Sequence, residues 1–272
     1  MTHAEILEIE GKVYMRKECC DEEIVLLDND AEFYKKMVLP FTCSFIEAKE
    51  GCYIYSREIM QEIIQKAPSL ILYITSFCNL NCPVCYLRLG EHNILNNPRF
   101  HIPLRRLMKI LRKMPPSKFI GLCGGEVTLR EDLPEIVEFL KDSGHEVGIA
   151  TNGLRLGDEE YVKELEKAGI DLIALSFDGF NEHVYEKLRG RRLLKEKMFA
   201  LKNLKKRKIN TWLYMTVKKG LNDNEIGKIL RFAATNHDFI KGIRFQILEE
   251  NSGEEMTDSD IFKLLGKELG IS

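Results

Sequence analysis

Residues 69–90, SLILYITSFCNLNCPVCYLRLG, join an apolar run to a polar loop that holds three cysteines. The run is short, is bounded by polar residues and is rich in Leu and Ile, so it predicts a buried strand. Cys78, Cys82 and Cys85 follow at the spacing C-x3-C-x2-C. The stretch therefore predicts a strand whose carboxyl end carries a group of thiols.

Strand patterns then alternate with segments of helical period along the rest of the chain. Strands that are apolar on both faces and are separated by helices imply a parallel sheet covered by helices. This α/β pattern suits either an incomplete barrel of the TIM type or a doubly wound sheet, and in both architectures ligands gather at the carboxyl ends of the strands. Of the two we expect the partial (β/α)6 barrel. The six expected strands are residues 69–76, 118–125, 146–153, 171–179, 211–220 and 242–248.

Two of the expected helices carry signals at both ends. Asp132 and Glu135 predict a capping box at the start of one helix, which Gly144 ends. Asp158 predicts the cap of the next helix, which Gly169 ends. These signals support the alternation of strands and helices.

Residues 1–68 read differently from the barrel, which we expect to span 69–272. Two strands around Glu10 and Gly11 and a helix over 57–67 predict a small N-terminal α+β appendage. Four scattered cysteines lie in this region; they suit either a second metal, zinc or iron–sulfur, or small buried side chains. These cysteines are Cys19, Cys20, Cys43 and Cys52.

Residues 188–208, LRGRRLLKEKMFALKNLKKRK, carry ten Lys or Arg and one Glu. A basic helix can bind phosphates or a membrane surface. An apolar stripe of helical period favours instead a helix with a solvated basic face. The stripe is expected at Leu194, Met198, Leu201 and Leu204.

Composition narrows the class of protein. The 272 residues are 44% hydrophobic and 30% charged, which is ordinary for a globular chain, and no run is long enough to span a membrane. The net charge of -2 does not indicate nucleic acid as a partner. No secretory signal opens the sequence, so we expect a cytoplasmic protein, in which clustered cysteines are more often ligands than disulfides.

Three thiolates on one loop suit an iron–sulfur cluster, because sulfur is a soft ligand. A four-iron cluster with three cysteine ligands leaves one iron open to another molecule. Two alternatives remain: a redox pair of Cys82 and Cys85, and a structural zinc completed by Cys123.

The three-cysteine motif, followed by GGEVT at 124–128, resembles the radical S-adenosylmethionine (SAM) superfamily. The resemblance implies a [4Fe–4S] cluster on the three cysteines and cleavage of SAM to a 5′-deoxyadenosyl radical, which abstracts hydrogen from a substrate. It also implies that Gly124, Gly125 and Glu126 bind the amino end of SAM, and that a reductant protein of the ferredoxin or flavodoxin type supplies the electron.

Small polar residues end the third and fourth expected strands. Their groups suit ribose hydroxyls and a carboxylate, and the family uses similar positions for SAM. A guanidinium also matches a carboxylate bidentately, and Arg189 is the candidate, with Arg191 or Arg192 as alternatives. The strand-end candidates are Thr151, Asn152, Ser176 and Asp178.

Within the superfamily, GKVYMRKEC, RGRRLL and KGIRFQ are similar to the archaeal tetraether lipid synthase and pterin methylase-like group, in a shortened form. A lipid, a pterin or a peptide is therefore a candidate substrate, and a large substrate or a partner protein suits an open barrel mouth. The rival function is a non-catalytic electron carrier or cluster scaffold.

Overall fold

The computed structural model describes residues 4–17, 23–28, 69–85, 87, 89–90, 94–115, 118–248 and 256–270. The chain divides into two compact units. One consists of Arg57–Thr216 and Lys228–Arg244, and the other of Met1–Ser56, Val217–Gly227 and Phe245–Ser272. The expected boundary between residues 68 and 69 stays a prediction.

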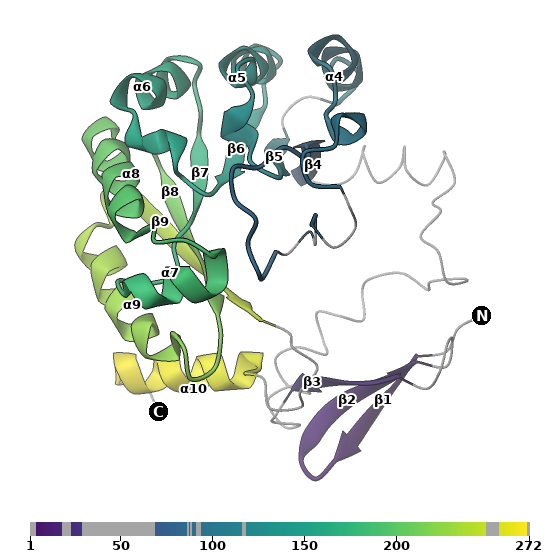
Figure 1. Cartoon of the computed structure of the whole chain (residues 1–272), viewed down its shortest axis with the longest axis vertical. Helices are drawn as coiled ribbons and strands as arrows, with labels where there is room; N and C mark the ends of the chain where they lie inside the picture. Colours follow the sequence, from purple (N-terminus) through teal and green to yellow (C-terminus); the bar gives the residue numbers. More distant parts are fainter. Residues whose placement is uncertain are drawn as a thin grey trace. The chain divides into compact units, whose positions relative to one another are not determined.

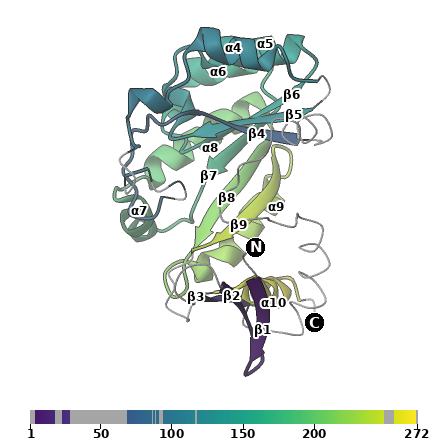
Figure 2. The ribbon, with the colours of Figure 1, turned by 90° about the vertical axis from the view of Figure 1, so that its right-hand side faces the viewer.

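A six-stranded sheet has the order β4-β5-β6-β7-β8-β9, so each strand lies beside the next one in sequence (Figures 1 and 2). The pairs from β4 to β8 are parallel. All six expected strands are confirmed, within a few residues at their ends. Their bounds are β4 Ser69–Thr75, β5 Phe119–Gly124, β6 Glu146–Thr151, β7 Leu172–Ser176, β8 Thr211–Val217 and β9 Ile240–Ile247.

Helices α4, α5, α6 and α8 lie along one face of this sheet (Figure 1). Alternate strand residues point to that face, and Leu122, Ile149 and Leu175 are buried there. The helices are α4 Leu104–Leu111, α5 Leu133–Asp142, α6 Glu159–Lys167, α7 Glu182–Arg189, α8 Leu194–Arg207, α9 Ile226–Thr235 and α10 Asp258–Leu269. Short 3-10 helices are η2 Pro98–Phe100, η3 Val127–Leu129, η4 Arg155–Gly157 and η5 Asp223–Glu225.

The helix-end signals were only partly right. The Asp158 carboxylate accepts the Glu160 N–H at 3.0 Å, so this cap is confirmed. Gly144 and Gly169 follow their helices with φ of 81° and 86°, values that suit glycine. The capping box at Asp132 is wrong: its side chain makes no capping bond and instead binds the Arg130 guanidinium through two contacts of 2.8 Å.

A separate antiparallel sheet has the order β1-β2-β3. Strands β1 (Ala4–Ile9) and β2 (Lys12–Lys17) flank a turn at Glu10 and Gly11, which confirms the expected hairpin. Strand β3 (Glu23–Asp28) was not expected. The helix expected at 57–67 and the four N-terminal cysteines lie outside the described residues.

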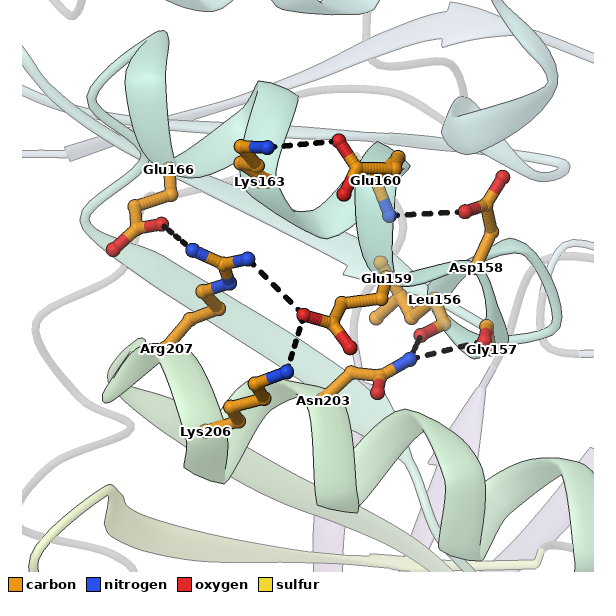
Figure 3. A network of polar contacts seen from close by, with 10 residues as sticks. All are labelled: Leu156, Gly157, Asp158, Glu159, Glu160, Lys163, Glu166, Asn203, Lys206 and Arg207. Atoms are coloured by element: carbon orange, nitrogen blue, oxygen red, sulfur yellow. Dashed lines mark hydrogen bonds and ion pairs between the residues drawn. The ribbon is translucent and has the colours of Figure 1, made fainter.

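The stripe expected on helix α8 is partly right, since Leu201 and Leu204 are buried and Leu194 is half-buried. Met198 is 39% exposed, whereas Lys197 and Asn203 are buried. Figure 3 shows Asn203 donating its amide N–H groups to the carbonyls of Leu156 and Gly157, at 2.9 and 3.0 Å. The helix is therefore fixed by polar contacts to the chain after β6 as well as by apolar packing.

The basic face of α8 is paired with acidic groups of α6. Glu159 binds Lys206 at 2.6 Å and Arg207 at 3.1 Å, and Arg207 also approaches Glu166 at 3.4 Å (Figure 3). Partly exposed ion pairs of this kind contribute little to stability. They account for two of the basic charges of α8, Lys206 and Arg207, without a phosphate or a membrane.

Among the described residues, no helix is long and apolar enough to cross a membrane.

Candidate functional site

The cysteine loop leaves the carboxyl end of β4 and is anchored from both sides. The Cys78 N–H donates to Asn96 Oδ1 at 2.9 Å, and the Asn96 N–H donates to the Ser76 carbonyl at 3.1 Å. The Phe77 ring stacks on His101, with centroids 4.9 Å apart. The loop therefore has a defined path, with Cys78, Cys82 and Cys85 half-buried along it.

The far side of the loop packs on α7. Cys78, Cys82 and Leu80 lie against a small core that includes Tyr185, which belongs to that helix. At the end of α7, Gly190 has a φ of 73°, and a β-carbon there would lie 3.5 Å from the Pro83 ring. Loop and helix end are therefore in contact.

Burial favours the protonated form of two of these thiols, Cys78 and Cys82. It raises the pKa of Cys78 to about 11, and the nearby Glu126, Cys82 and Cys85 raise it further as like charges. Burial also raises the pKa of Cys82, against the opposing effect of Arg189. Thiolates at these positions need a cationic partner, and a metal cluster provides one.

The donor set fits an iron–sulfur cluster. The Leu80 N–H donates to the Cys78 sulfur at 3.4 Å, a contact that stabilises a thiolate ligand. Among the described residues no three His, Cys, Asp or Glu side chains surround one metal-ion position. The cysteines of a four-iron cluster each bind a different iron, so convergence on a single ion is not required.

Cys123 stands apart from this set. Burial alone raises its pKa to about 11, whereas the like charges acting on Cys78 come from Glu126, Cys82 and Cys85. Among the described residues, which include all four of these cysteines, no three metal-binding side chains surround one metal-ion position, so a zinc site completed by Cys123 has no support.

The glycines of the GGE segment allow a close approach to the chain itself. Gly124 has a φ of 143°, and a β-carbon there would collide with the Thr75 carbonyl. A β-carbon on Gly125 would collide with the Phe77 carbonyl. The N–H groups of Gly125 and Glu126 donate to these carbonyls at 2.8 and 2.7 Å. The glycines therefore hold the end of β5 against the start of the cysteine loop.

Glu126 is fully buried and both of its carboxylate oxygens are bonded. Oε1 accepts the Thr128 and Thr151 hydroxyls, each at 2.6 Å, and the Thr128 N–H at 3.1 Å. Oε2 accepts the Asn152 N–H at 2.6 Å. The carboxylate thus fixes the end of β6 to the end of β5, and its predicted contact with SAM stays a prediction.

Asn152 extends this network to the cysteine loop. Its Nδ2 donates to Asn79 Oδ1 at 2.8 Å, and its Oδ1 accepts the Leu154 N–H at 3.0 Å. The hydroxyl oxygen of Thr151 also accepts the Gly153 N–H at 3.0 Å. Three predicted site residues therefore share one network.

Asp178 and Arg189 form a buried ion pair at the ends of β7 and α7. The guanidinium binds both carboxylate oxygens, at 2.8 and 2.7 Å, and also the Thr216 hydroxyl at 2.8 Å. Asp178 raises the pKa of Arg189, and Cys82 contributes in the same direction. The pairing engages Arg189 within the protein, so its predicted contact with the SAM carboxylate stays a prediction.

The two alternatives to Arg189 point elsewhere. Arg191 and Arg192 are exposed, and Arg192 pairs with Glu186 at 2.6 Å on the surface. Of the three arginines, Arg189 is the one that adjoins the cysteines.

Lys197 also belongs to this site, although it was not among the residues expected from the sequence. Its side chain is completely buried, and its Nζ donates to the carbonyls of Asn152 and Ser176 at 2.6 and 2.7 Å. Burial lowers the pKa of Lys197 to about 8, although Asp178 acts in the opposite direction. A signal was present, because Lys197, Ala200 and Leu204 have the spacing of a buried helix face.

Comparison with known proteins agrees with this geometry. The family model described as the radical SAM superfamily matches residues 72–233. A 7,8-dihydro-6-hydroxymethylpterin dimethyltransferase of Methanocaldococcus jannaschii is 36% identical over 89% of this chain and 50% of its own length. A probable GTP 3′,8-cyclase of Thermococcus kodakarensis is 32% identical over 72% of this chain and 61% of its own. The chain thus spans between half and three fifths of these two relatives.

Solved structures support the fold. Streptococcus suis SuiB has a TM-score of 0.60 at 16% identity and covers 97% of this chain, which covers 67% of SuiB. The structure of anSMEcpe with bound AdoMet and a peptide has a TM-score of 0.55 at 22% identity, over 74% of this chain and 58% of that one. The three-cysteine loop, the parallel sheet and the matched family model lead to one conclusion: this chain belongs to the radical SAM superfamily.

Proposed function

We propose that this chain holds a [4Fe–4S] cluster on Cys78, Cys82 and Cys85 and binds SAM beside it, at the ends of β5, β6 and β7. The observation that carries the proposal is the three half-buried thiols on one anchored loop, which Asn79 joins to the GGE segment through Asn152. When bound, the cluster supplies the electron that splits SAM into methionine and a 5′-deoxyadenosyl radical, which takes hydrogen from the substrate.

The protein's part in this chemistry is placement. The bonds from Glu126 to Thr151 and Asn152 fix two strand ends, and the bonds of Asn79 and Asn96 fix the cysteine loop. Pre-positioned groups of this kind lower the entropy lost when a cofactor and a substrate meet. A reductant protein of the ferredoxin or flavodoxin type is the proposed source of the electron.

The test is anaerobic reconstitution with iron and sulfide, followed by reduction in the presence of SAM and measurement of 5′-deoxyadenosine. We expect cleavage in the wild type and its loss, together with loss of bound iron, in Cys78→Ala, Cys82→Ala and Cys85→Ala. Cys123→Ala is the matched control and keeps its iron. An iron-loaded wild type that binds no SAM and forms no 5′-deoxyadenosine is the non-catalytic carrier instead.

The open face of the sheet supports a proposal for the substrate. Register pairs Tyr73 with Cys123, and Ala150 with Ala174, which in turn pairs with Trp212. Tyr73 is 53% exposed and Trp212 is 38% exposed, on the side away from the buried Leu213. Aromatic side chains on an exposed sheet face provide stacking surfaces for flat rings.

We propose a substrate with a bicyclic nitrogen heterocycle that stacks on this face. The two relatives are named for a dihydropterin and for GTP, and both molecules contain such a ring system. A lipid chain offers no flat face to stack, and a peptide offers one only at an aromatic side chain.

Trp212 is the only tryptophan of the chain, so its fluorescence reports on this face directly. We expect quenching by a dihydropterin or by GTP and none by a fatty acid. Trp212→Ala weakens binding by about tenfold, since stacking contributes about 1–3 kcal/mol. Trp212→Phe loses the signal but keeps binding in calorimetry. Quenching by the fatty acid alone contradicts the proposed substrate class.

A further inference from the structure

Lys197 carries a charge in a place that lysines rarely occupy. It lies in the first turns of α8 with no exposed surface. Removing an ammonium from water costs several kcal/mol unless bonds and opposite charges compensate. An apolar residue would fill the same position on a helix at lower cost, so the bonds that Lys197 makes need an explanation.

The bonds of Lys197 lie just beyond the end of the pairing between β6 and β7. The described pairing of β6 with β7 runs from Gly148–Leu172 to Thr151–Leu175. The Lys197 ammonium donates to the next carbonyl of each strand, at Asn152 and Ser176. One side chain from the covering helix thus joins the two strands just beyond the last paired residues.

Opposite charges make this burial tolerable. Glu126 and Asp178 are fully buried carboxylates that act on the ammonium, and Arg189 is the other cation of the group. The formal charges of these four side chains cancel. The Tyr185 ring adds a cation–π contact, with Nζ 5.9 Å from its centroid.

Asn152 passes this constraint to the cysteine loop. Its backbone carbonyl accepts from Lys197, its backbone N–H donates to Glu126, and its side chain donates to Asn79. A shift of the Asn152 carbonyl would therefore also disturb the contacts of Asn152 with Glu126 and with Asn79 of the cysteine loop.

We propose that Lys197 is a positioning residue for SAM: it fixes the strand ends at Asn152 and Ser176 in the geometry that receives the cofactor. This inference rests on the proposed function, because it concerns the same cofactor. Lys197 is not proposed to contact SAM or the cluster. It acts through the two carbonyls.

The test compares Lys197→Met with Lys202→Met, a matched control at an exposed position of the same helix. The affinity for SAM is measured by calorimetry on the iron-loaded protein without reductant, so that no cleavage occurs. We expect Lys197→Met to bind SAM at least tenfold more weakly while its iron and sulfide content stays at the wild-type value. Lys202→Met binds as the wild type does.

Unchanged affinity in an iron-loaded Lys197→Met protein overturns the inference and leaves the proposed function intact. A wild type that binds no SAM overturns the proposed function itself. Lys197→Gln, which keeps one donor group, is expected to restore part of the affinity.

Hydrogen exchange of the wild type provides a test without any substitution. If Lys197 positions the strand ends in advance, the amides of residues 152–154 exchange slowly before SAM is added and little more slowly afterwards. Fast exchange that SAM alone suppresses contradicts the inference, since the cofactor would then create the order ascribed to Lys197.

Discussion

Side chains with full charges form the centre of this site, and their neighbours decide their properties. Glu126, Asp178 and Lys197 have no exposed surface, and Arg189 is nearly buried. Each has its partners within the protein, at distances between 2.6 and 3.1 Å. Single substitutions in such a group are expected to destabilise the fold, because the loss of one charged side chain leaves an opposite charge buried without its partner.

The Asp178–Arg189 pair leads to a prediction about the stability of the free protein. Asp178→Ala leaves a buried guanidinium without its carboxylate and is expected to lower the free energy of unfolding by about 3–5 kcal/mol. The double variant with Arg189→Met removes both charges and is expected to lose less. Urea unfolding of both single variants and the double variant completes the cycle. Losses that simply add contradict a coupled pair.

Lys197 predicts a particular pH dependence. Its pKa is lowered from 10.5 to about 8 in the folded protein, so between these values the unfolded chain binds more protons than the folded one. The contribution of Lys197 to the free energy of unfolding therefore rises with pH between these two pKa values. Relative to Lys197→Met, the wild type is expected to gain about 1 kcal/mol between about pH 7 and pH 9. A constant difference in urea midpoint across this range contradicts the lowered pKa.

At the scale of elements, the site depends on how closely β5 approaches the cysteine loop. Gly125→Ala places a methyl group against the Phe77 backbone, which cannot move aside as a side chain would. We expect a loss of about 2 kcal/mol or more, together with reduced iron uptake.

Gly144→Ala is the matched control for this substitution. Gly144 also follows an element, with a φ of 81°, and an added methyl group would meet nothing within 4 Å. It is expected to cost about 1 kcal/mol through its backbone conformation alone and to leave iron uptake unchanged. Equal iron uptake in Gly125→Ala and Gly144→Ala would mean that close packing does not position the loop.

The strands were predictable because their signals are local. The strands β4 to β7 are short apolar runs, and each ends in glycine or a small polar residue. The cap at Asp132 failed because Arg130, two residues away, competes for the same carboxylate. Strand β3 was missed because a short apolar run does not by itself distinguish a strand from a buried helix.

The candidate site was predictable in part for the same reason. The cysteine motif and the strand ends can be read along the chain, whereas the burial of Lys197 depends on carbonyls at Asn152 and Ser176, 45 and 21 residues away. The local spacing of Lys197, Ala200 and Leu204 indicates a buried helix face, but it does not say which carbonyls the ammonium binds. Likewise, the sequence does not tell which of Arg189, Arg191 and Arg192 lies in the site, because this depends on the position of Asp178, which pairs with Arg189.

At the scale of the whole molecule, the open question is how many metal centres the eight cysteines serve. Cys78, Cys82 and Cys85 share a loop, whereas Cys123 belongs to β5. The other four lie outside the described residues, so the second metal site proposed for them rests on the sequence alone.

Iron analysis of the whole chain tests this point. One cluster on the three loop cysteines gives about four iron and four sulfide per chain. A variant with Cys19, Cys20, Cys43 and Cys52 all replaced by Ala is expected to keep that content and the wild-type affinity for SAM. The contacts that the structure describes for the loop come from residues outside the N-terminal region, at Ser76, Asn96, Asn152 and α7. A wild-type content of about eight iron that halves in this variant would establish a second cluster, and zinc lost in the variant would establish a zinc site instead.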